Sequence, residues 1–514
     1  MTPPAPSAPG ARADRGRIAL LAGALLLIAG NLFVEAMAPP KDDVAWLIYV
    51  AQKWLDGGQP YVTEIEINPP PIIWFSALAV WMARLFGVSV MTLYPALVSL
   101  MAALIAWWVA SLLVRRLIFR SATAVFVVTV CVLLFVPSGE FGQREHLIAC
   151  LALPWLAWRV AAGGENRPSA AEGFAAGLLI GMCCGLKPFF ALPFLIVEGA
   201  MWRVDGRFGW SAMAGALVCG AGVVALSLIV HPAYFAEVVP LAFSLYRAPF
   251  DLAIMVPRGA MLLVAVMFGA WGLWWLRRRD LRDGYLALIL LLFATGALVV
   301  YLVAGRGWFY QRIPATVATV LAVCALLARL PRDIATRSAV AVMLLALAGQ
   351  AGARFVPRIN AATGHVPALS EQIAQVVREH GATSVMALSS TLGMGFPVVQ
   401  LSQTQWTSRF ASMWAVRGEV AAELANGGAE GSSIARRWVV DDFLAACPDI
   451  VVMDGADGLD YPEVLSHFDP AFAQAWSGYE LIAGPLGVEM FQRSSDAPPC
   501  RARPMLLSVP LSDR

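Results

Sequence analysis

The sequence predicts a polytopic α-helical membrane protein that ends in a soluble α/β domain. Of its 514 residues, 59% are hydrophobic and only 14% are charged, and the mean hydropathy is +0.68. Long apolar runs recur from residue 17 to residue 353 and then give way to short apolar strands and amphipathic helices. The core of a soluble protein could not absorb so much apolar surface, so the apolar runs predict a membrane domain.

The N-terminus predicts a tail followed by a membrane anchor. Residues 1–16 are rich in proline and alanine, which predicts a disordered cytoplasmic tail. The first apolar span, 18–37, follows three arginines and ends near the small residues 36–38, as a cleaved signal peptide would. Because Pro39 would follow that cut and the span is long, a retained anchor is favoured.

Apolar runs predict about eleven transmembrane helices within a domain spanning residues 17–353. Several runs fall short of the ~20 residues that an untilted crossing needs, so their boundaries are soft. The runs are 18–37, 90–113, 121–137, 147–162, 173–186, 188–201, 208–230, 257–276, 284–304, 313–328 and 336–352.

The arginines predict the orientation of these helices. With the N-terminus in the cytoplasm, one assignment returns every arginine-rich loop to that side. It requires the run 70–87 to lie on the membrane as a juxtamembrane helix within an external loop, 38–89. It also requires the break after Lys187 to be an external hairpin between two short helices. In the alternative, 70–87 spans the bilayer and 173–201 crosses once, which would leave the basic cluster 115–120 outside.

The first external loop contains the most informative motif of the chain. Two adjacent acids, Asp42 and Asp43, precede a Gly-Gly-Gln-Pro-Tyr turn, a further acid at Glu66 and three prolines at 69–71. This order resembles the first external loop of the GT-C superfamily of membrane glycosyltransferases, which includes aminoarabinose transferases and protein O-mannosyltransferases. In that loop an acid just after helix one is followed by a glycine-tyrosine turn and an acid-x-x-Pro-Pro element. Asn68 departs from the pattern, because relatives often carry lysine there.

The resemblance implies transfer of a sugar from a polyprenyl-phosphate donor at the periplasmic face. Asp42 or Asp43 is then the candidate base that removes the proton of the acceptor hydroxyl. Glu66 matches the acid of the acid-x-x-Pro-Pro element, which in relatives lies in the active-site cavity and sometimes near a metal. Glu145 and His146 correspond to the second external acid and could orient the acceptor, assist the base or bind a divalent ion. A divalent metal cofactor is therefore left open.

The leaving phosphate of such a reaction needs fixed cations or hydrogen-bond donors in a site that excludes water. Ionisable groups at membrane depth are expensive and mostly functional. Each could instead be a snorkelling, capping or interfacial residue that serves only the fold. The residues expected to bind the lipid phosphate or the sugar are Tyr61, Arg144, Lys187, Arg247, Arg306, Tyr310 and Arg312.

Residues 354–514 predict a small periplasmic α/β domain, since an odd number of crossings precedes it. The expected elements are a helix at 370–379, buried strands at 384–388 and 450–453, a helix at 461–476 interrupted at Pro470, and a terminal hairpin of 479–482 with 488–491. The domain has no GxGxxG or Walker signature, so nucleotide binding is not indicated.

Two residue groups in this domain suggest further chemistry. Five acids could bind a cation or an acceptor glycan, although solvated surface loops are the default explanation: Asp441, Asp442, Asp454, Asp457 and Asp460. Six of the eight cysteines lie in apolar segments. The other two, Cys447 and Cys500, are expected to pair if the domain is periplasmic, although Cys500 could also remain free.

The sequence therefore predicts a hexosyl- or pentosyltransferase of the cell envelope, in the bacterial inner membrane. Its partners would be a polyprenyl-phosphate sugar donor, a lipid, glycan or protein acceptor, and membrane lipids. The net charge of +2 argues against nucleic acid. A lipid or polysaccharide transporter is the alternative, but a transporter should carry polar groups along a path through the bilayer. A purely structural membrane protein would leave the external acids free to vary.

Overall fold

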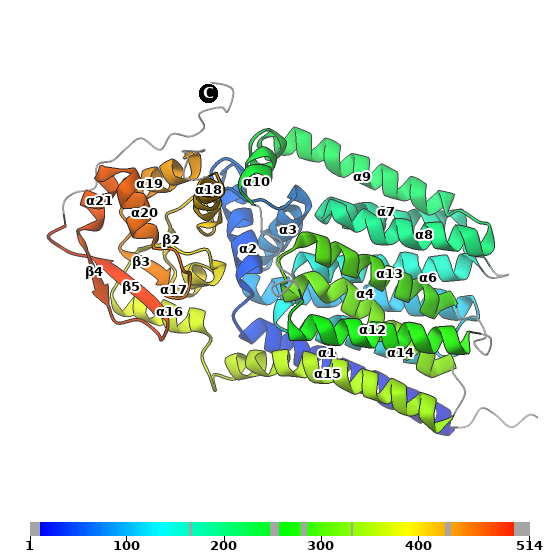
Figure 1. Cartoon of the computed structure of the whole chain (residues 1–514). Coiled ribbons are helices and arrows are strands. Elements are labelled where there is room, and N and C mark those ends of the chain that lie inside the picture. Colours follow the sequence, from blue (N-terminus) through cyan, green and yellow to red (C-terminus); the bar gives the residue numbers. More distant parts are fainter. Residues whose placement is uncertain are drawn as a thin grey trace, which may run out of the picture. The chain divides into compact units, whose positions relative to one another are not determined.

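The structure is a computed structural model that describes residues 11–163, 167–246, 256–278, 285–329, 333–426 and 433–497 (Figure 1). The chain divides into two compact units, each assembled from separate stretches of sequence. We call Met1–Ala36, Pro95–Val223 and Phe250–Ile359 the bundle unit. We call Met37–Tyr94, Val224–Pro249 and Asn360–Arg514 the sheet unit.

The described residues of the bundle unit form helices joined by loops and contain no strand, as the apolar runs predict. Its elements are α1 (Ala11–Met37), α4 (Val90–Arg115), α5 (Ala122–Phe135), η1 (Ser138–Glu140), α6 (Arg144–Ala162), α7 (Ala170–Leu186), η2 (Pro188–Phe190), α8 (Ala191–Asp205), α9 (Trp210–Val230), α12 (Arg258–Arg277), α13 (Tyr285–Ala304), η4 (Phe309–Arg312), α14 (Ile313–Arg329) and α15 (Ile334–Ala362).

Seven helices of the described residues are long and apolar enough to cross a bilayer, which makes this a multi-pass membrane protein. They are Arg17–Met37, Val90–Arg115, Trp210–Val230, Gly259–Arg277, Tyr285–Ala304, Phe309–Ala328 and Ile334–Ala362. The remaining predicted spans coincide with the shorter helices α5, α6, α7 and α8. The predicted total of eleven crossings stays a prediction.

Small residues let two helices of the bundle approach each other closely. Gly173, Gly177 and Gly181 recur every fourth residue along α7. A Cβ on Gly177 would lie only 1.9 Å from the carbonyl oxygen of Ala212 in α9. Membrane helices associate through such backbone contact because lipid gives no hydrophobic drive between them. The break that the sequence predicts after Lys187 is present, since α7 ends at Leu186 and α8 packs back against it.

The sheet unit combines the loop predicted to be external with Val224–Pro249 and the C-terminal domain. Its helices are α2 (Asp42–Leu55), α3 (Pro70–Phe86), η3 (Tyr234–Val238), α10 (Val239–Leu245), α16 (Leu369–Glu379), η5 (Leu392–Met394), α17 (Val398–Ser402), α18 (Trp414–Ala425), α19 (Ile434–Ala446), α20 (Tyr461–Phe468) and α21 (Pro470–Trp476). The expected juxtamembrane run is α3, which prolines open and Gly87 closes in the left-handed conformation at φ 65°.

Five strands form one sheet in the order β2-β1-β3-β5-β4. They are β1 (Ser384–Ala387), β2 (Gln405–Trp406), β3 (Ile450–Asp454), β4 (Tyr479–Ile482) and β5 (Val488–Arg493). β1 pairs in parallel with β2 and β3, whereas β5 is antiparallel to β3 and β4. The two predicted buried strands and the terminal hairpin are thus confirmed. β2, α18 and α19 were not anticipated.

Three boundaries differ from those read off the sequence. α1 begins at Ala11, inside the stretch expected to be a disordered tail. α15 continues to Ala362, past the predicted domain boundary at residue 354. The sheet unit also contains Met37–Tyr94 and Val224–Pro249, which the sequence-based division places in the membrane domain.

Candidate functional site

Asp42 and Asp43 lie in the first turn of α2, where the helix dipole favours negative charge. Lys41 precedes the helix and makes no side-chain cap. The Asp42 Oδ1 atom accepts a hydrogen bond from the Asp43 backbone N–H at 2.8 Å and lies 3.4 Å from Lys41 Nζ. The Asp42 side chain is 20% exposed, so its carboxylate can meet a ligand hydroxyl as a base must.

Glu66 is buried in a hydrogen-bonded network that closes the first external loop. Its Oε1 atom accepts from the Asn68 N–H at 2.6 Å, and its Oε2 atom accepts from the indole N–H of Trp46 in α2. Tyr61, which has a positive φ of 73°, donates its hydroxyl to the Asn68 carbonyl at 2.8 Å. These bonds fasten the acid-x-x-Pro-Pro element to α2. They give Glu66 a positioning role, and its predicted catalytic role stays a prediction.

The C-terminal part of the sheet unit holds the same loop from its other side. Ile65 donates its N–H to the Arg409 carbonyl at 2.7 Å, and it forms an isolated bridge with Phe410. Arg409 in turn pairs with the fully buried carboxylate of Asp442 at 2.7 Å. Gln400 also donates to the Ala45 carbonyl of α2 at 2.9 Å. The loop with Asp42 is therefore part of the same packed unit as the sheet.

In the bundle unit, Glu145 and Lys187 form a buried ion pair. Lys187 Nζ lies 2.6 Å from Glu145 Oε1, and the Glu145 side chain is fully buried at the start of α6. Glu145 Oε2 accepts no hydrogen bond from the described residues. Lys187 thus has a carboxylate partner in the protein, which the sequence did not reveal. Its predicted role as a ligand of the lipid phosphate stays a prediction.

His146 faces the interior of the bundle unit beside that pair. Its Nδ1 atom accepts a hydrogen bond from the Gly142 N–H at 3.0 Å, so a neutral ring carries its proton on Nε2. Nε2 is buried and has no hydrogen-bond partner among the described residues. His146 is therefore part of the packed interior of the bundle unit.

Arg312 is the most unusual charge in the bundle unit. Only 2% of it is exposed, and its Nε atom has no hydrogen-bond partner. Arg354 of α15 stacks on the ring of Phe309, with Cζ 3.8 Å from the ring centroid, and Arg312 Cζ lies 5.1 Å from the same centroid. Within the described part of the chain, neither guanidinium has an ion pair with an acid. The buried Arg312 and the exposed Arg354 thus present guanidinium donors near one ring, and donors of this kind suit an anion.

An apolar cavity of about 390 Å³ adjoins these arginines. Phe309 and Gln350 are part of its wall, and Gln350 donates to the Gly259 carbonyl at 3.0 Å. The remaining wall consists mostly of apolar side chains of α5, α14 and α15: Cys131, Val132, Phe135, Val136, Thr316, Val320, Leu344, Leu347, Ala348, Ala351, Gly352 and Phe355. An apolar cavity with arginines near one side suits an amphiphile that has an anionic head group.

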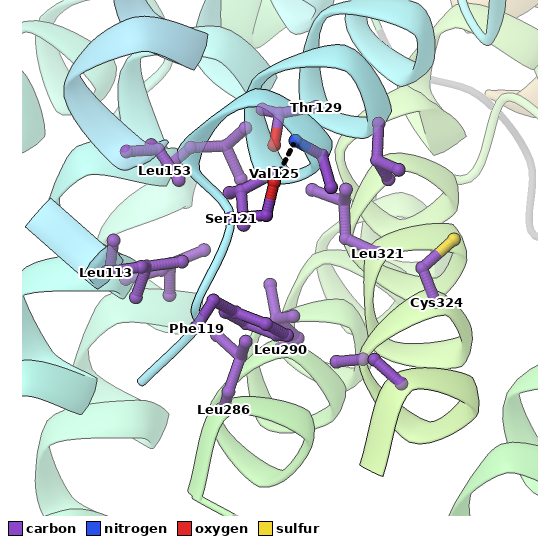
Figure 2. Close-up of a pocket in the computed structure, with 17 residues that line it drawn as sticks. Leu113, Phe119, Ser121, Val125, Thr129, Leu153, Leu286, Leu290, Leu321 and Cys324 are labelled. Atoms are coloured by element: carbon purple, nitrogen blue, oxygen red, sulfur yellow. Dashed lines mark hydrogen bonds between the residues drawn. The ribbon is translucent and has the colours of Figure 1, made fainter. Parts of the chain in front are cut away.

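A second cavity of the bundle unit, of about 210 Å³, has a different character (Figure 2). Its lining includes Leu113, Phe119, Leu290 and Cys324, and no charged side chain belongs to it. Its few polar groups are largely satisfied locally, as where Ser121 caps α5 by accepting from the Ala124 N–H. This cavity can hold hydrocarbon and offers nothing to an anionic group.

Of the other residues expected from the sequence, Arg306 and Tyr310 contact the same ring, that of Trp308. Arg144 is half-buried at the start of α6, and Arg306 stacks near Trp308 with Cζ 5.5 Å from the ring centroid. Tyr310 stacks on Trp308 at 5.6 Å. Arg247 lies outside the described residues, as does Cys500, so the pairing of Cys447 with Cys500 stays a prediction.

The five C-terminal acids do not form one group. Asp442 is buried against Arg409, whereas Asp454, Asp457 and Asp460 share the loop that follows β3. No cluster of three or more metal-ligating side chains occurs among the described residues. The expected cation site at these acids therefore has no structural support in that part of the chain.

Sequence reasoning missed Arg354 and the buried pair of Arg358 with Glu35. Arg354 and Arg358 recur at helical spacing in a helix that was expected to end at residue 352. Glu35 stands alone in an apolar span, and an isolated acid of this kind was the available signal for a buried partner.

Neither the protein-family models nor the curated protein sequences give a match to this chain. Solved structures do. ArnT from Cupriavidus metallidurans, bound to undecaprenyl phosphate, is 15% identical with a TM-score of 0.51, over 93% of this chain and 98% of ArnT. The oligosaccharyltransferase AglB from Archaeoglobus fulgidus, in complex with an inhibitory peptide and a dolichol-phosphate, is 12% identical with a TM-score of 0.44, over 95% and 75% of the two chains. The ArnT match shows that this chain shares the fold of ArnT.

Proposed function

We propose that this protein is a glycosyltransferase that moves a sugar from a polyprenyl-phosphate donor to a lipid, glycan or protein acceptor. The shared fold with ArnT, which was solved with undecaprenyl phosphate, supports this class of donor. The transfer takes place at the periplasmic face of the inner membrane, as the distribution of arginines among the loops favours. The sheet unit then lies on the periplasmic side.

The buried guanidinium of Arg312, which has no acidic partner among the described residues, is the observation that carries the proposal; the exposed Arg354 lies near the same ring. A buried guanidinium without a counter-ion is costly, and a bound anion removes that cost. The wall of the cavity extends along α15 from Phe355 back to Leu344, a distance of about 16 Å. The phosphate of a polyprenyl carrier would meet Arg312 and Arg354, and the first isoprene units would fill the cavity.

The chemistry needs one base and one stabilised leaving group. The acceptor oxygen attacks the anomeric carbon of the donor sugar, and the bond from that carbon to the phosphate oxygen breaks. The acceptor proton passes to the carboxylate of Asp42 or Asp43, and the polyprenyl phosphate leaves with the electron pair. Arg312 and Arg354 stabilise the charge that develops on the phosphate. Asp42 and Asp43 are both partly accessible, so both are candidates for the base.

Other expected residues take supporting roles in this proposal. Glu66 holds the loop that follows α2 through its bonds to Trp46 and Asn68. Lys187 and Glu145 form a neutral pair that fixes the N-terminus of α6 against the end of α7. If a divalent metal takes part, the exposed edge of Asp42 and its neighbour Asp43 would supply the oxygen ligands that such ions prefer.

The decisive experiment compares binding with transfer in nanodiscs. Wild type should bind undecaprenyl phosphate and should transfer labelled sugar from polyprenyl-phosphate donors to acceptors in a membrane extract. One of Asp42→Asn and Asp43→Asn should abolish transfer and leave undecaprenyl phosphate binding unchanged, because the amide keeps the shape and cannot take the proton. Full activity of both Asp42→Asn and Asp43→Asn would remove this loop from the mechanism. Passage of labelled lipid across the bilayer without any transfer would instead identify a transporter.

A further inference from the structure

The C-terminal sheet contains a topological switch point. The chain leaves β1 to form β2 on one side and later returns to form β3 on the other side of β1, and all three strands are parallel. Loops at the carboxyl ends of such strands diverge at this point, and open α/β sheets bind their ligands there. In this chain the two loops are Ser389–Thr391 after β1 and Asp454–Asp457 after β3. Together with Arg417 we call them the switch-point surface.

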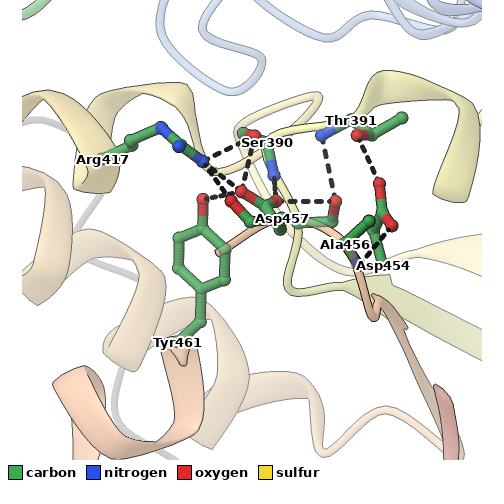
Figure 3. Close-up of polar contacts among 8 residues, drawn as sticks. Ser390, Thr391, Arg417, Asp454, Ala456, Asp457 and Tyr461 are labelled. Carbon is green, nitrogen blue, oxygen red and sulfur yellow. Dashed lines mark hydrogen bonds and ion pairs between the residues drawn. The ribbon is translucent and has the colours of Figure 1, made fainter. Parts of the chain in front are cut away.

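The centre of the switch-point surface is a satisfied polar network (Figure 3). The Asp457 side chain is only 2% exposed and accepts hydrogen bonds from Ser389 Oγ at 3.0 Å and from Ser390 Oγ at 2.9 Å. Arg417 Nη1 pairs with the same carboxylate, and Tyr461 Oη approaches it at 3.4 Å. Asp457 therefore locks the two loops together and has no capacity left for a ligand.

The rim of this surface has the opposite character. Asp454 receives a hydrogen bond from Thr391 Oγ1 at 2.8 Å and another from the Ala456 N–H at 2.9 Å, which leaves carboxylate lone pairs for further donors. Thr391 is exposed, and the Arg417 side chain is 48% exposed. Among the described contacts, Arg417 uses only Nη1, so its other N–H groups can donate to a ligand. The rim thus presents hydrogen-bond acceptors and donors side by side, above the satisfied network around Asp457.

The net charge of the switch-point surface indicates which class of ligand it can bind. Two carboxylates, Asp454 and Asp457, face the single guanidinium of Arg417, so the surface is net negative and disfavours phosphates and other anions. The described residues contain no metal-ligating cluster. A neutral ligand with many hydroxyl groups fits, because its hydroxyls can donate to Asp454 or to the Thr391 oxygen and accept from Arg417.

The switch-point surface lies beside Asp42, one of the two candidate bases, within the sheet unit. From Thr391 the chain passes directly into η5, which contacts α2. A Cβ on Gly393 would be 3.7 Å from Asp42 Oδ2 and 3.9 Å from Thr391 Cγ2. Asp42, Gly393, Thr391 and Asp454 therefore form a short path from the carboxylate to the rim.

We infer that the switch-point surface binds a neutral carbohydrate, and, resting on the proposed function, that this carbohydrate is part of the acceptor. Asp454 and Thr391 hold its hydroxyls, and the bound chain extends across Gly393 toward Asp42. The surface would then decide which acceptors reach the base, and it would not affect the lipid donor.

Binding by the full-length protein in nanodiscs tests this site without requiring transfer. The probes are a panel of neutral oligosaccharides and, for contrast, the same sugars bearing phosphate. Wild type should bind neutral members saturably. Asp454→Asn and Thr391→Val should each weaken binding by about 10-fold or more, as expected for a lost hydrogen bond to a charged group. Thr391→Ser should keep most of the affinity, and phosphorylated sugars should bind more weakly than neutral ones.

Glu480→Gln is the matched control, because Glu480 is an exposed acid on β4 of the same sheet. It should bind like wild type, and thermal unfolding should show all four variants as stable as wild type. The site is overturned if wild type binds no neutral sugar of the panel, or if Asp454→Asn binds as tightly as wild type. Absence of sugar transfer in the same wild-type preparation would count against the proposed function and leave the binding result standing.

Discussion

Two buried arginines of the bundle unit have opposite surroundings. Arg159, 1% exposed in α6, has its Nη1 atom 2.8 Å from Asp205 and its Nε atom 3.2 Å from Glu198. Its Nη2 atom also donates to the Arg207 carbonyl at 3.0 Å. Arg312, 2% exposed at the start of α14, has ring contacts and no acidic partner among the described residues. The two arginines are buried to nearly the same extent. They differ in the source of their anion, because the described residues supply carboxylates to Arg159 and none to Arg312.

The contrast separates a structural charge from one that awaits a ligand. Around Arg159 the protein provides both carboxylates, and Glu198 is itself bonded by the Gly209 N–H at 2.6 Å. A complete network of this kind rigidifies its surroundings and needs nothing from outside. Around Arg312 the protein provides a second cation, Arg354, and an apolar cavity. Without an anion, this arrangement lowers the stability of the folded protein. A bound anion removes that loss.

The largest expected effect is that of Arg159→Met. The change leaves Glu198 and Asp205 as buried or half-buried acids without their cation, which should cost about 3–5 kcal/mol of unfolding free energy. Thermal unfolding in detergent and the yield of folded protein measure this loss. An Arg159→Met protein as stable as wild type would mean that water already screens the network.

Arg312→Met should have the reverse outcome. Removing an unpaired buried charge should leave the ligand-free protein at least as stable as wild type, because no partner is stranded. Affinity for undecaprenyl phosphate should fall about 10-fold to 100-fold, as expected for the loss of a charge-assisted hydrogen bond. Arg278→Met is the matched control, because Arg278 is an exposed arginine of the bundle unit that stacks on Trp275 and is not expected to bind the phosphate. Equal affinity of Arg312→Met and wild type would move the phosphate site elsewhere.

The Glu145 and Lys187 pair lies between these two cases and ranks third. Glu145→Gln should destabilise the protein by about 1–3 kcal/mol, because it strands a lysine whose side chain is only 13% exposed. Lys187→Met should do the same to the acid, whereas the double variant should recover much of the loss. Thermal unfolding of the four proteins gives the coupling directly. Additive single effects would show that the pair is not coupled, and would return Lys187 to the list of phosphate ligands.

Local patterns in the sequence predict the secondary-structure elements and single out the acids that follow the first apolar span. They do not reveal which residues from distant parts of the chain pair with each other. The strand at 450–453 and the hairpin that begins at Tyr479 follow from short apolar runs and turn residues, and the structure has both. The burial of Asp442 depends on Arg409, and the neutralisation of Lys187 depends on Glu145. Those partners lie far away in the chain, so no local periodicity reports them. The Phe309 stack was missed for the same reason, since it joins η4 to a helix expected to have ended.

The smallest predicted effect concerns Asp449, a carboxylate that the sheet unit satisfies with neutral donors alone. Burial raises its pKa, but hydrogen bonds from Thr383 and Ser384 outweigh burial and hold the pKa below its usual value. The Asp449 Oδ2 atom accepts from the Thr383 N–H and hydroxyl, each at 2.7 Å, and from the Ser384 N–H at 3.0 Å. A lowered pKa means that the folded state binds fewer protons than the unfolded state. The contribution to stability is therefore present above the ordinary aspartate range and is lost as the pH falls through the lowered value.

Asp449→Asn should remove this contribution. The variant thereby tests how much a carboxylate that the protein bonds only to neutral donors adds to stability. At neutral pH it should cost about 0.5–1 kcal/mol, at the low end for a hydrogen bond to a charged group because the side chain is partly exposed to solvent. The difference from wild type should shrink as the pH falls from the ordinary aspartate range through the lowered pKa of Asp449, because protonation leaves both side chains neutral. Thermal unfolding of wild type and Asp449→Asn at several pH values between 3 and 7 measures it. A stability difference that stays constant over this range would show that the amide's changed hydrogen bonding causes the loss, and that the charge of Asp449 contributes nothing.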